Sequence, residues 1–394
     1  MKFYHNNKII INDNNRTIFY SLFNNVSVSE NCYYPGLKLL DNSKNIIDPY
    51  DEKIMSFDIP DDLNNIKFNN TQNIANGDYF FFVYNFDNYF HFIYDTLPIL
   101  WTYFYLKKSI SKLKLLINYP NTKNKFYQFN LEFLNLLDLD FVICNNNFKY
   151  ENLYISSSLT HSNKSNEPPC LQIFEIYNRL TNKIIKNPSL IIDNIYVSRR
   201  TWIHNNFDNI GTNYTQRRKL INEDELVKEL NKLGYIEVFC ENLDTNQKIN
   251  LFKNAKNVIG IVGGGMCNLL FSPPSVNTYC IVSPYFLDIN NRFKYSMEHT
   301  NIKYYNETNI YKTTDIPMFV RIKTNDNFIG EIIDYDKDKG YLVNLSNNDV
   351  AGFNSTMNFK KEYLQTNEFK TLDNGLNSPF EIDINKFIDF VQQK

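Results

Sequence analysis

Alanine, histidine and tryptophan are scarce in this chain of 394 residues. There are five histidines and two tryptophans, and alanine occurs only at Ala75, Ala255 and Ala351. By contrast, about one residue in six is asparagine, and tyrosine and phenylalanine occur 28 and 32 times. The enriched types have AT-rich codons and alanine has GC-rich codons, so we attribute the bias to the genome and not to function.

The six cysteines form none of the short motifs that hold structural zinc. Cys-x-x-Cys and Cys-x-x-His are both absent, and the cysteines are scattered from Cys32 to Cys280. Such a distribution also argues against a disulfide framework and is typical of a reducing compartment. We therefore expect a protein of the cytoplasm.

Neither an excess of charge nor a long apolar run is present. Lys and Arg number 41 against 43 Asp and Glu, a net charge of -2, which argues against a nucleic-acid partner. The most apolar stretch, 79–105, is interrupted by charged residues and by Pro98. No window offers the ~20 apolar residues of a membrane span, and the N-terminus has no apolar core of signal-peptide length. We expect no membrane span.

The length predicts about two or three domains of ~150 residues each. Residues 1–75 are Asn-rich and favour irregular strands and loops. From Phe80 on, strands and helices alternate, which is typical of an α/β domain with a largely parallel sheet. The predicted strands are 80–84, 112–119, 141–144 and 152–156, and the predicted helices are 91–107 and 132–139. We assign 1–170 to this first domain and 171–186 to a linking helix.

A second α/β domain is predicted over 187–314, with the order strand, helix, strand, Gly-rich turn, helix, strand. Asn222 with Glu225 forms a capping box at the start of a helix, and Gly234 stands where that helix ends. Either Asp244 or Thr245 caps the next helix. The strands are 194–198, 236–240, 258–262 and 278–283. This order is that of a nucleotide-binding fold.

The last segment, 315–394, has a different pattern. Alternating runs at 319–324, 328–335 and 340–345, with a turn at 336–340, predict a small antiparallel β module. A closing helix is predicted over 384–391.

The turn Gly263-Gly264-Gly265 follows a buried strand and precedes a helix. Backbone N–H groups and a helix N-terminus at such a turn favour a phosphate group. Alternatively, the glycines only allow tight packing of strand and helix. A dinucleotide fingerprint needs a third glycine where Asn268 stands, so a flavin or NAD enzyme is disfavoured.

Three motifs in order resemble glycosyltransferase family 61. They are Asn88–Pro98 (NYFHFIYDTLP), Tyr196–Arg200 (YVSRR) and the run from Arg217 to Ser275 that contains IVGGGMCN. The resemblance spans roughly 80–284 and covers neither the first 75 residues nor the segment after 315.

The resemblance implies a GT-B architecture, in which two Rossmann-like domains face a cleft. It implies a nucleotide-sugar donor, most simply a uridine diphosphate (UDP) sugar, and a glycan or glycoprotein acceptor. Transfer would invert the anomeric carbon without a required metal and without a further cofactor. We interpret the pair Asp336 and Asp338, outside the resemblance, as a solvated turn and not as a metal site.

One position departs from the family pattern. Relatives usually have histidine immediately before Gly-Ala-Gly, and here that position is Val262, with Gly264 in place of the alanine. Altered donor choice, lower activity and loss of activity all remain open. The alternative function is therefore a catalytically degenerate nucleotide-binding, glycan-binding or structural protein on the same scaffold.

Inverting transfer needs positive charge for the leaving diphosphate and a base for the acceptor hydroxyl. Arg199 and Arg218 are the candidates for the diphosphate, because a guanidinium can contact two phosphate oxygens at once. Glu241 is the candidate for the ribose hydroxyls, and Asn268 either contacts the donor or caps the backbone. For the arginines the alternative is a surface salt bridge, and for Glu241 a helix-end charge.

His91 and Asp95 are the candidates for catalysis. Their spacing of four places them on one face of a helix. A carboxylate beside an imidazole can orient it, and either group can take the proton. We predict Asp95 as the base with His91 in support, and exchanged roles are nearly as well supported. The alternative is a purely structural pair.

These features together predict a cytoplasmic sugar transferase from an AT-rich genome, either a large DNA virus or a bacterium. If the source is viral, the protein would act in the host cytoplasm or the virion. Formation of a homodimer is left open.

Overall fold

The protein is described by a computed structural model. Its described residues are 7–12, 17–29, 39–44, 46–47, 67–69, 71–82, 88–119, 125–160, 168–184, 191–200, 218–284, 286, 291–310, 319–322, 325–336, 340–347, 354–359, 364–365 and 380–393.

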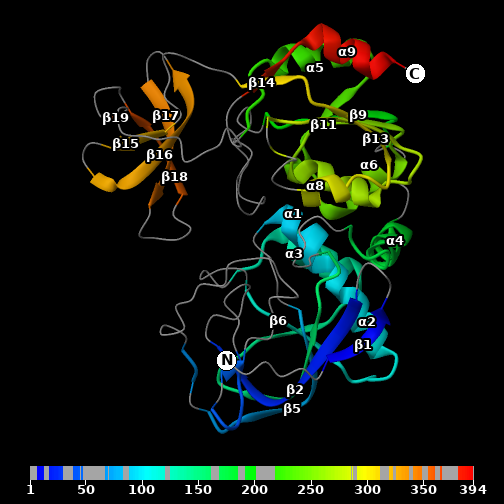
Figure 1. Ribbon diagram of the computed structural model, residues 1–394, viewed down its shortest axis with the longest axis vertical. Coiled ribbons are helices and arrows are strands. Elements are labelled where there is room, and N and C mark those ends of the chain that lie inside the picture. Colours follow the sequence, from blue (N-terminus) through cyan, green and yellow to red (C-terminus); the bar gives the residue numbers. More distant parts are fainter. Residues whose placement is uncertain are drawn as a thin grey trace.

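The first α/β unit is built on an eight-stranded mixed sheet, drawn in blue to teal in Figure 1. Its order is β4-β3-β2-β8-β5-β6-β7, with β1 added to β2. Strands β8, β5, β6 and β7 run parallel, as the alternation of strand and helix predicts, while β1 to β4 are antiparallel additions. The bounds are β1 Asn7–Asn12, β2 Thr17–Val28, β3 Leu39–Leu40, β4 Ile46–Ile47, β5 Ile74–Phe81, β6 Lys114–Ile117, β7 Phe141–Ile143 and β8 Lys149–Ser156.

The crossover from β5 to β6 departs from the single helix predicted over 91–107. It consists of α1 Tyr89–His91, a π-helical turn η2 Phe92–Thr96, a 3-10 turn η3 Leu97–Ile99 and α2 Leu100–Lys107. Pro98 has no N–H to donate to the preceding turn, and a continuous α-helix through it is therefore unfavourable. The wider turn η2 carries Asp95, and π turns of this kind are frequent at functional sites. The next crossover contains α3 Gln128–Leu136.

The second α/β unit has a five-stranded parallel sheet of order β10-β9-β11-β12-β13. The strands are β9 Asn194–Val197, β10 Ile236–Val238, β11 Asn257–Ile261, β12 Asn277–Ile281 and β13 Asn301–Tyr305. The connecting helices are α5 Glu223–Lys232, η6 Cys240–Asn242, α6 Thr245–Asn254, η7 Gly264–Phe271 and α8 Asn291–Tyr295. The strand order reverses between β9 and β11, and ligands of such sheets bind at the carboxyl ends of the strands at this point.

The helix ends of this unit confirm two of the capping predictions and correct one. Gly234 has a φ of 79°, the left-handed conformation that ends α5. Asp244 caps α6, because its side chain accepts from the N–H of Gln247 at 2.8 Å. Asn222 does not cap α5. Its amide instead pairs with the backbone of Ile382, donating to the carbonyl at 2.7 Å, and the predicted capping box is absent for that reason.

The C-terminal helix packs on the second unit. Helix α9 Ile384–Gln392 follows β20 Phe380–Ile382, and β20 pairs antiparallel with β14 Thr308–Ile310. Phe387 is fully buried and shares a core cluster with Leu226 and Leu230 of α5. The closing helix thus completes the second unit, beside α5 in Figure 1.

Between these elements, five strands form a separate antiparallel sheet of order β18-β17-β16-β15-β19 (orange in Figure 1). They are β15 Phe319–Ile322, β16 Asn325–Asp336, β17 Gly340–Asn347, β18 Asn354–Phe359 and β19 Leu364–Gln365. The middle of the predicted turn at 336–340, including Asp338, lies outside the described residues. The domain boundaries at 170, 187 and 315 stay predictions.

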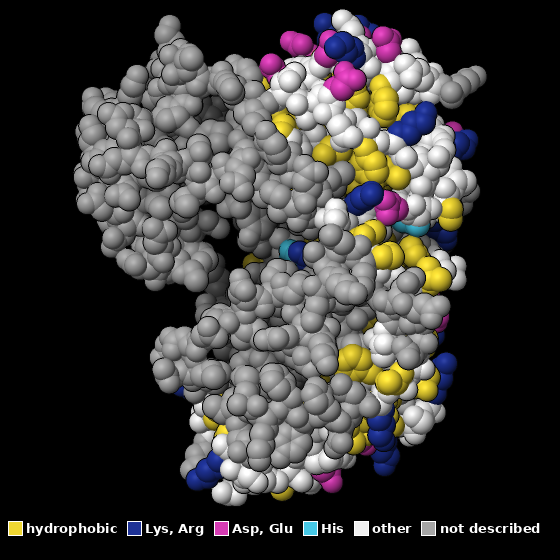
Figure 2. Space-filling view, in the orientation of Figure 1, with side chains coloured by type: hydrophobic (Ala, Val, Ile, Leu, Met, Phe, Trp, Pro, Cys, Tyr) yellow, Lys and Arg dark blue, Asp and Glu magenta, His cyan; other side chains and the backbone are white. Residues whose placement is uncertain are grey.

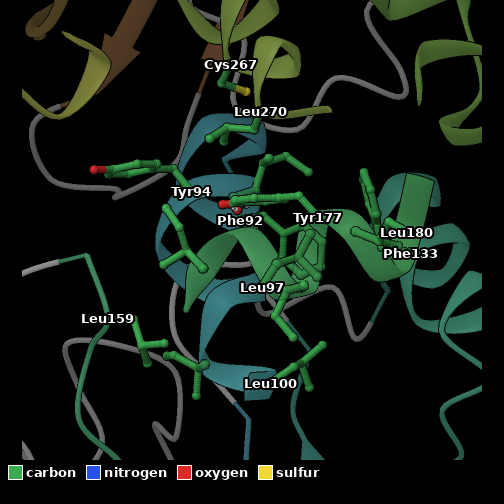
Figure 3. Packing of buried hydrophobic residues seen from close by; sticks show 14 of the residues in the cluster. Phe92, Tyr94, Leu97, Leu100, Phe133, Leu159, Tyr177, Leu180, Cys267 and Leu270 are labelled. Carbon is green, nitrogen blue, oxygen red and sulfur yellow. Dashed lines mark hydrogen bonds between the residues drawn. The ribbon is translucent and has the colours of Figure 1, made fainter. Parts of the chain in front are cut away.

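The two α/β units share one hydrophobic core. Helix α4 Ile173–Lys183, predicted as the link over 171–186, lies between them, and its Tyr177 packs edge-on against Phe271 at 5.8 Å between ring centroids. Phe133 of α3 stacks on the same ring at 6.0 Å. Figure 3 shows Cys267 and Leu270 of the second unit beside Phe92 and Tyr177. Within the described part of the chain, no helix is long and apolar enough to cross a membrane.

Candidate active site

The point where the strand order reverses is occupied by Arg199 and Gly263. Arg199 follows β9 and Gly263 follows β11, so both lie at the carboxyl edge of the second sheet. A Cβ atom on Gly263 would stand 2.0 Å from Nη1 of Arg199. The guanidinium therefore lies directly on the glycine backbone, and no larger residue fits there without displacing it.

A buried carboxylate holds the end of β9. Oε1 of Glu223 accepts from the backbone N–H of Arg199 at 2.9 Å, from the Tyr196 hydroxyl at 2.8 Å and from the Ser198 hydroxyl at 3.1 Å. Burial raises the pKa of Glu223 and lowers the pKa of Arg199. The carboxylates of Glu223 and Glu241 act on Arg199 in the opposite direction and offset part of the cost of its burial.

The other two glycines of the turn have different neighbours. A Cβ on Gly265 would come within 2.9 Å of Cγ1 of Val197, which explains that glycine by close packing of turn and strand. A Cβ on Gly264 would meet only the Cβ of Phe90, at an ordinary 3.9 Å. Gly264 and Gly265 are the first residues of the 3-10 helix η7, and Gly263 stands immediately before it.

Asn268 holds the turn and joins the two units. Its Nδ2 donates to the carbonyl of Gly265 at 2.8 Å, which is the backbone-capping alternative of the sequence analysis. Its Oδ1 accepts from the hydroxyl of Tyr89 in the first unit at 2.5 Å. Asn268 is fully buried, and its contact with a donor stays a prediction.

Val262, which departs from the family pattern, is fully buried and belongs to the hydrophobic core shared by the two units. Its backbone N–H donates to the carbonyl of Ile281 at 2.9 Å. At this position the chain therefore has an apolar core residue instead of a polar ring.

Arg218 lies at the end of a row of aromatic side chains. Its guanidinium stands 4.2 Å above the ring of Phe286. The ring of Phe286 packs edge-on against Phe293, and Phe293 stacks on Phe90 of the first unit with centroids 3.6 Å apart. Arg218 itself has a φ of 58°. The row ends next to His91, because Phe90 precedes it in α1.

His91 and Asp95 are in direct contact, as their spacing predicts. Nδ1 of His91 lies 2.6 Å from Oδ2 of Asp95. Asp95 is fully buried, while the side chain of His91 is 22% exposed. Thr160, which follows β8, donates to Oδ1 of Asp95 at 3.1 Å, and Arg292 of α8 donates to Oδ2 at 3.1 Å. A carboxylate with these partners is an acceptor that orients its neighbours.

Asp95 and Thr160 lie beyond the carboxyl ends of β5 and β8, and Arg199 lies beyond that of β9. In Figure 2, cyan and dark blue atoms, which belong to His and to Lys or Arg, come to the surface between the upper and lower halves of the molecule.

Glu241 lines a polar groove between α3 and α6 of about 230 Å³. Glu132 of the first unit lines the same groove and accepts from the N–H of Thr245 at 2.9 Å. Lys248 lines the groove as well, and its ammonium nitrogen lies 4.7 Å from the centroid of the Tyr89 ring. Lys248 is buried, and burial lowers the pKa of its ammonium group.

A family model described as Glycosyltransferase 61 matches residues 89–281 of the chain. This segment belongs to glycosyltransferase family 61. The matched segment contains every candidate site residue, from His91 and Asp95 through the arginines to the glycine turn and Asn268. A search of curated proteins finds no match.

Membership of glycosyltransferase family 61 implies a donor and an acceptor, and the candidate residues fall into two sets. His91 and Asp95 are in the first unit, while Arg199, Arg218 and the glycine turn are in the second. Within the described ranges, no group of three or more His, Cys, Asp or Glu side chains is arranged to hold a metal ion.

Three site residues were missed by the sequence analysis. Arg292 lies outside the matched segment and in no motif. Thr160 follows a predicted strand, and the carboxyl end of that strand was the signal that could have indicated it. Lys248 stands on the side of α6 that faces the groove, a position that depends on the packing of α6 against the first unit.

Proposed function

We propose that this chain transfers a sugar from a nucleotide sugar, with a UDP-sugar as the expected donor, to a glycan or glycoprotein. The observation that carries the proposal is the position of Arg199 on Gly263, at the reversal point of the second sheet, together with the contact between His91 and Asp95 in the first unit. The proposal includes a GT-B arrangement and inversion at the anomeric carbon, as the family resemblance implies, without a required metal.

The second unit would bind the donor. Arg199 and Arg218 can neutralise the diphosphate, whose charge grows as the bond to the sugar breaks. The amides of the glycine turn offer further donors. Glu241 can accept hydrogen bonds from the ribose hydroxyls in the groove.

His91 is the better candidate for the base, so the two roles are exchanged relative to the first expectation. Asp95 is fully buried and receives contacts on both carboxylate oxygens, whereas His91 is partly exposed. With Nδ1 directed at Asp95, Nε2 is the nitrogen that can take the proton of an acceptor hydroxyl. Attack by that oxygen on the anomeric carbon then displaces the nucleoside diphosphate on the opposite face.

A panel of nucleotide sugars tests the proposal. The protein should release a nucleoside diphosphate from one of them in the presence of a glycan acceptor. His91→Gln should lower the rate by about 10²–10⁴ without loss of nucleotide binding, because a general base contributes about that much. Absence of turnover together with absence of nucleotide binding in calorimetry would contradict the proposal.

A second candidate function is favoured by Val262. A core side chain at a position that is usually histidine is compatible with a degenerate transferase that only binds nucleotide or glycan. If this second function is right, the chain binds a nucleotide without sugar transfer, and Asp95→Asn leaves that binding unchanged. Detectable transfer excludes this candidate.

A further inference from the structure

One carboxylate oxygen of Asp95 serves two partners from different units. Oδ2 lies 2.6 Å from Nδ1 of His91 and 3.1 Å from Nη1 of Arg292, and Oδ1 accepts from Thr160. Asp95 is fully buried, and the side chain of Arg292 is 14% exposed. The three ionisable groups therefore interact with little screening by water.

Arg292 is held in this position by its own element. It lies in α8 of the second unit, and its backbone carbonyl accepts from the N–H of Ser296 at 3.0 Å. The next residue, Phe293, stacks on Phe90 of the first unit at 3.6 Å. Since Phe90 precedes His91, this contact links the segment that carries Arg292 to the segment that carries His91.

The charge on Arg292 changes what the His91–Asp95 pair can do. An isolated buried carboxylate stabilises a protonated imidazole, which cannot act as a base. A guanidinium on the same oxygen compensates the carboxylate, so a second positive charge on His91 becomes unfavourable. His91 keeps its hydrogen bond to Asp95 in this arrangement.

Two further ionisable side chains in the described part of the chain, a tyrosine and a cysteine, are uncharged around neutral pH. Tyr177 of α4 and Cys267 of η7 both lie near Asp95, and burial raises the pKa of each well above its ordinary value. On the other side, the ring of Phe90 packs against the ring of His91 with centroids 5.3 Å apart. Neither tyrosine nor thiol can supply the compensating charge.

We propose that Arg292 is a positioning residue which keeps His91 neutral by sharing the carboxylate of Asp95, so that the second unit controls the base of the first. This inference rests on the proposed function for its catalytic meaning. The effect of Arg292 on proton uptake by the His91–Asp95 pair does not depend on turnover and is measured without substrate.

The test is the titration of His91 in the full chain by ¹H–¹⁵N NMR of labelled histidine. His91 is one of five histidines, and His91→Gln identifies its signal. In Arg292→Gln the His91–Asp95 pair should take up its proton at a pH higher by about 1 unit, the size of effect that a charge within a few ångströms produces. Arg292→Lys keeps the charge and should titrate close to the wild type.

Arg179→Gln is the matched control. Arg179 is an exposed arginine on α4 that lies 4.5 Å from the ring of Phe104, so its loss removes one positive charge away from Asp95. It should leave the His91 titration unchanged. A His91 titration in Arg292→Gln at or below the wild-type pH overturns the inference.

Kinetics distinguish positioning from donor binding. In Arg292→Gln the acid limb of kcat/KM should move up by the same amount as the titration, with the KM for the donor unchanged. A raised KM with an unmoved acid limb overturns the inference and assigns Arg292 to the donor. If no transfer is found at all, the proposed function fails, while the NMR titration still decides the role of Arg292. A thermal melt of each variant shows whether it is folded. If Arg292→Gln does not fold, Arg292→Met removes the same charge with a long unbranched side chain and takes its place in both measurements.

Discussion

At the residue scale, Arg199 and Glu223 are buried ionisable groups at the end of β9. Glu223 binds the backbone of Arg199 and two hydroxyls, so it fixes the strand end from which the guanidinium reaches Gly263. Burial works against both charges. A ligand with negative charge would offset that cost for Arg199, which is the physical reason to place the diphosphate there.

Removal of either arginine should weaken nucleotide binding. Arg199→Ala and Arg218→Ala should each cost about 1.5–3 kcal/mol of affinity for UDP, the range for hydrogen bonds to charged groups. Calorimetry measures this, with Arg179→Ala as the control. Unchanged affinity in both variants would rule out the diphosphate assignment.

Glu223 should make stability depend on pH. Its folded pKa is raised above the ordinary value of 4.5, so the folded state holds a proton that the unfolded state has already released. Stability should therefore fall as pH rises from about 4.5 through the raised folded pKa, and Glu223→Gln should lack this fall. Urea unfolding across that range measures the difference between the two proteins. Glu225, exposed on the same helix, provides the control, and Glu225→Gln should show the same fall in stability as the wild type. If the unfolding free energies of Glu223→Gln and the wild type differ by the same amount at every pH, the prediction is contradicted.

At the element scale, two irregular elements present the site: the π turn that carries Asp95 and the glycine turn at the start of η7. The first follows from Pro98, which interrupts the α-helix, and the second from the approach of Arg199 and Val197 to the backbone. Regular helices at these positions would present different side chains.

Gly263→Ala should affect binding by moving Arg199. Its Cβ would overlap Nη1, which is the far end of a flexible side chain, so the fold should tolerate the change while UDP affinity falls as in Arg199→Ala. In the Arg199→Ala background the same substitution should have little further effect, because the displaced group is already gone. An additive loss in the double variant would show that Gly263 acts in another way.

The sequence predicted the elements of the second unit well and the partners of the site incompletely. The strands around 194–198 and 258–262 are apolar runs next to turn residues, and both are present. The predicted capping of α5 by Asn222 was wrong, because the Asn222 side chain binds the backbone of Ile382 in β20. That strand lies near the far end of the chain, and no local pattern reveals the contact. Arg292 reaches Asp95 across 197 positions, and that contact depends on how the two units pack.

At the scale of the whole molecule, the two α/β units are joined by a continuous core and completed by the C-terminal helix. Tyr177 and Phe133 meet Phe271 between the units, and Phe387 is buried against α5. The relative position of His91 and Arg199 therefore depends on the packing between the two units.

Phe387→Ala should destabilise the protein by about 3–5 kcal/mol, since it removes a fully buried aromatic ring from the second core cluster. Lys386→Ala, at a neighbouring exposed position, should change stability by less than about 0.5 kcal/mol. Urea unfolding compares the two, and equal stability would show that α9 contributes little to the second unit.

The most direct test of the central claim is to measure UDP binding and UDP-sugar turnover side by side in the wild type and in His91→Gln. If the second unit binds the donor and the first supplies the base, the variant binds UDP with wild-type affinity and loses about 10²–10⁴ of the rate of nucleotide release. Equal rates in the two proteins, or a wild type that neither binds UDP nor releases it, would contradict the account.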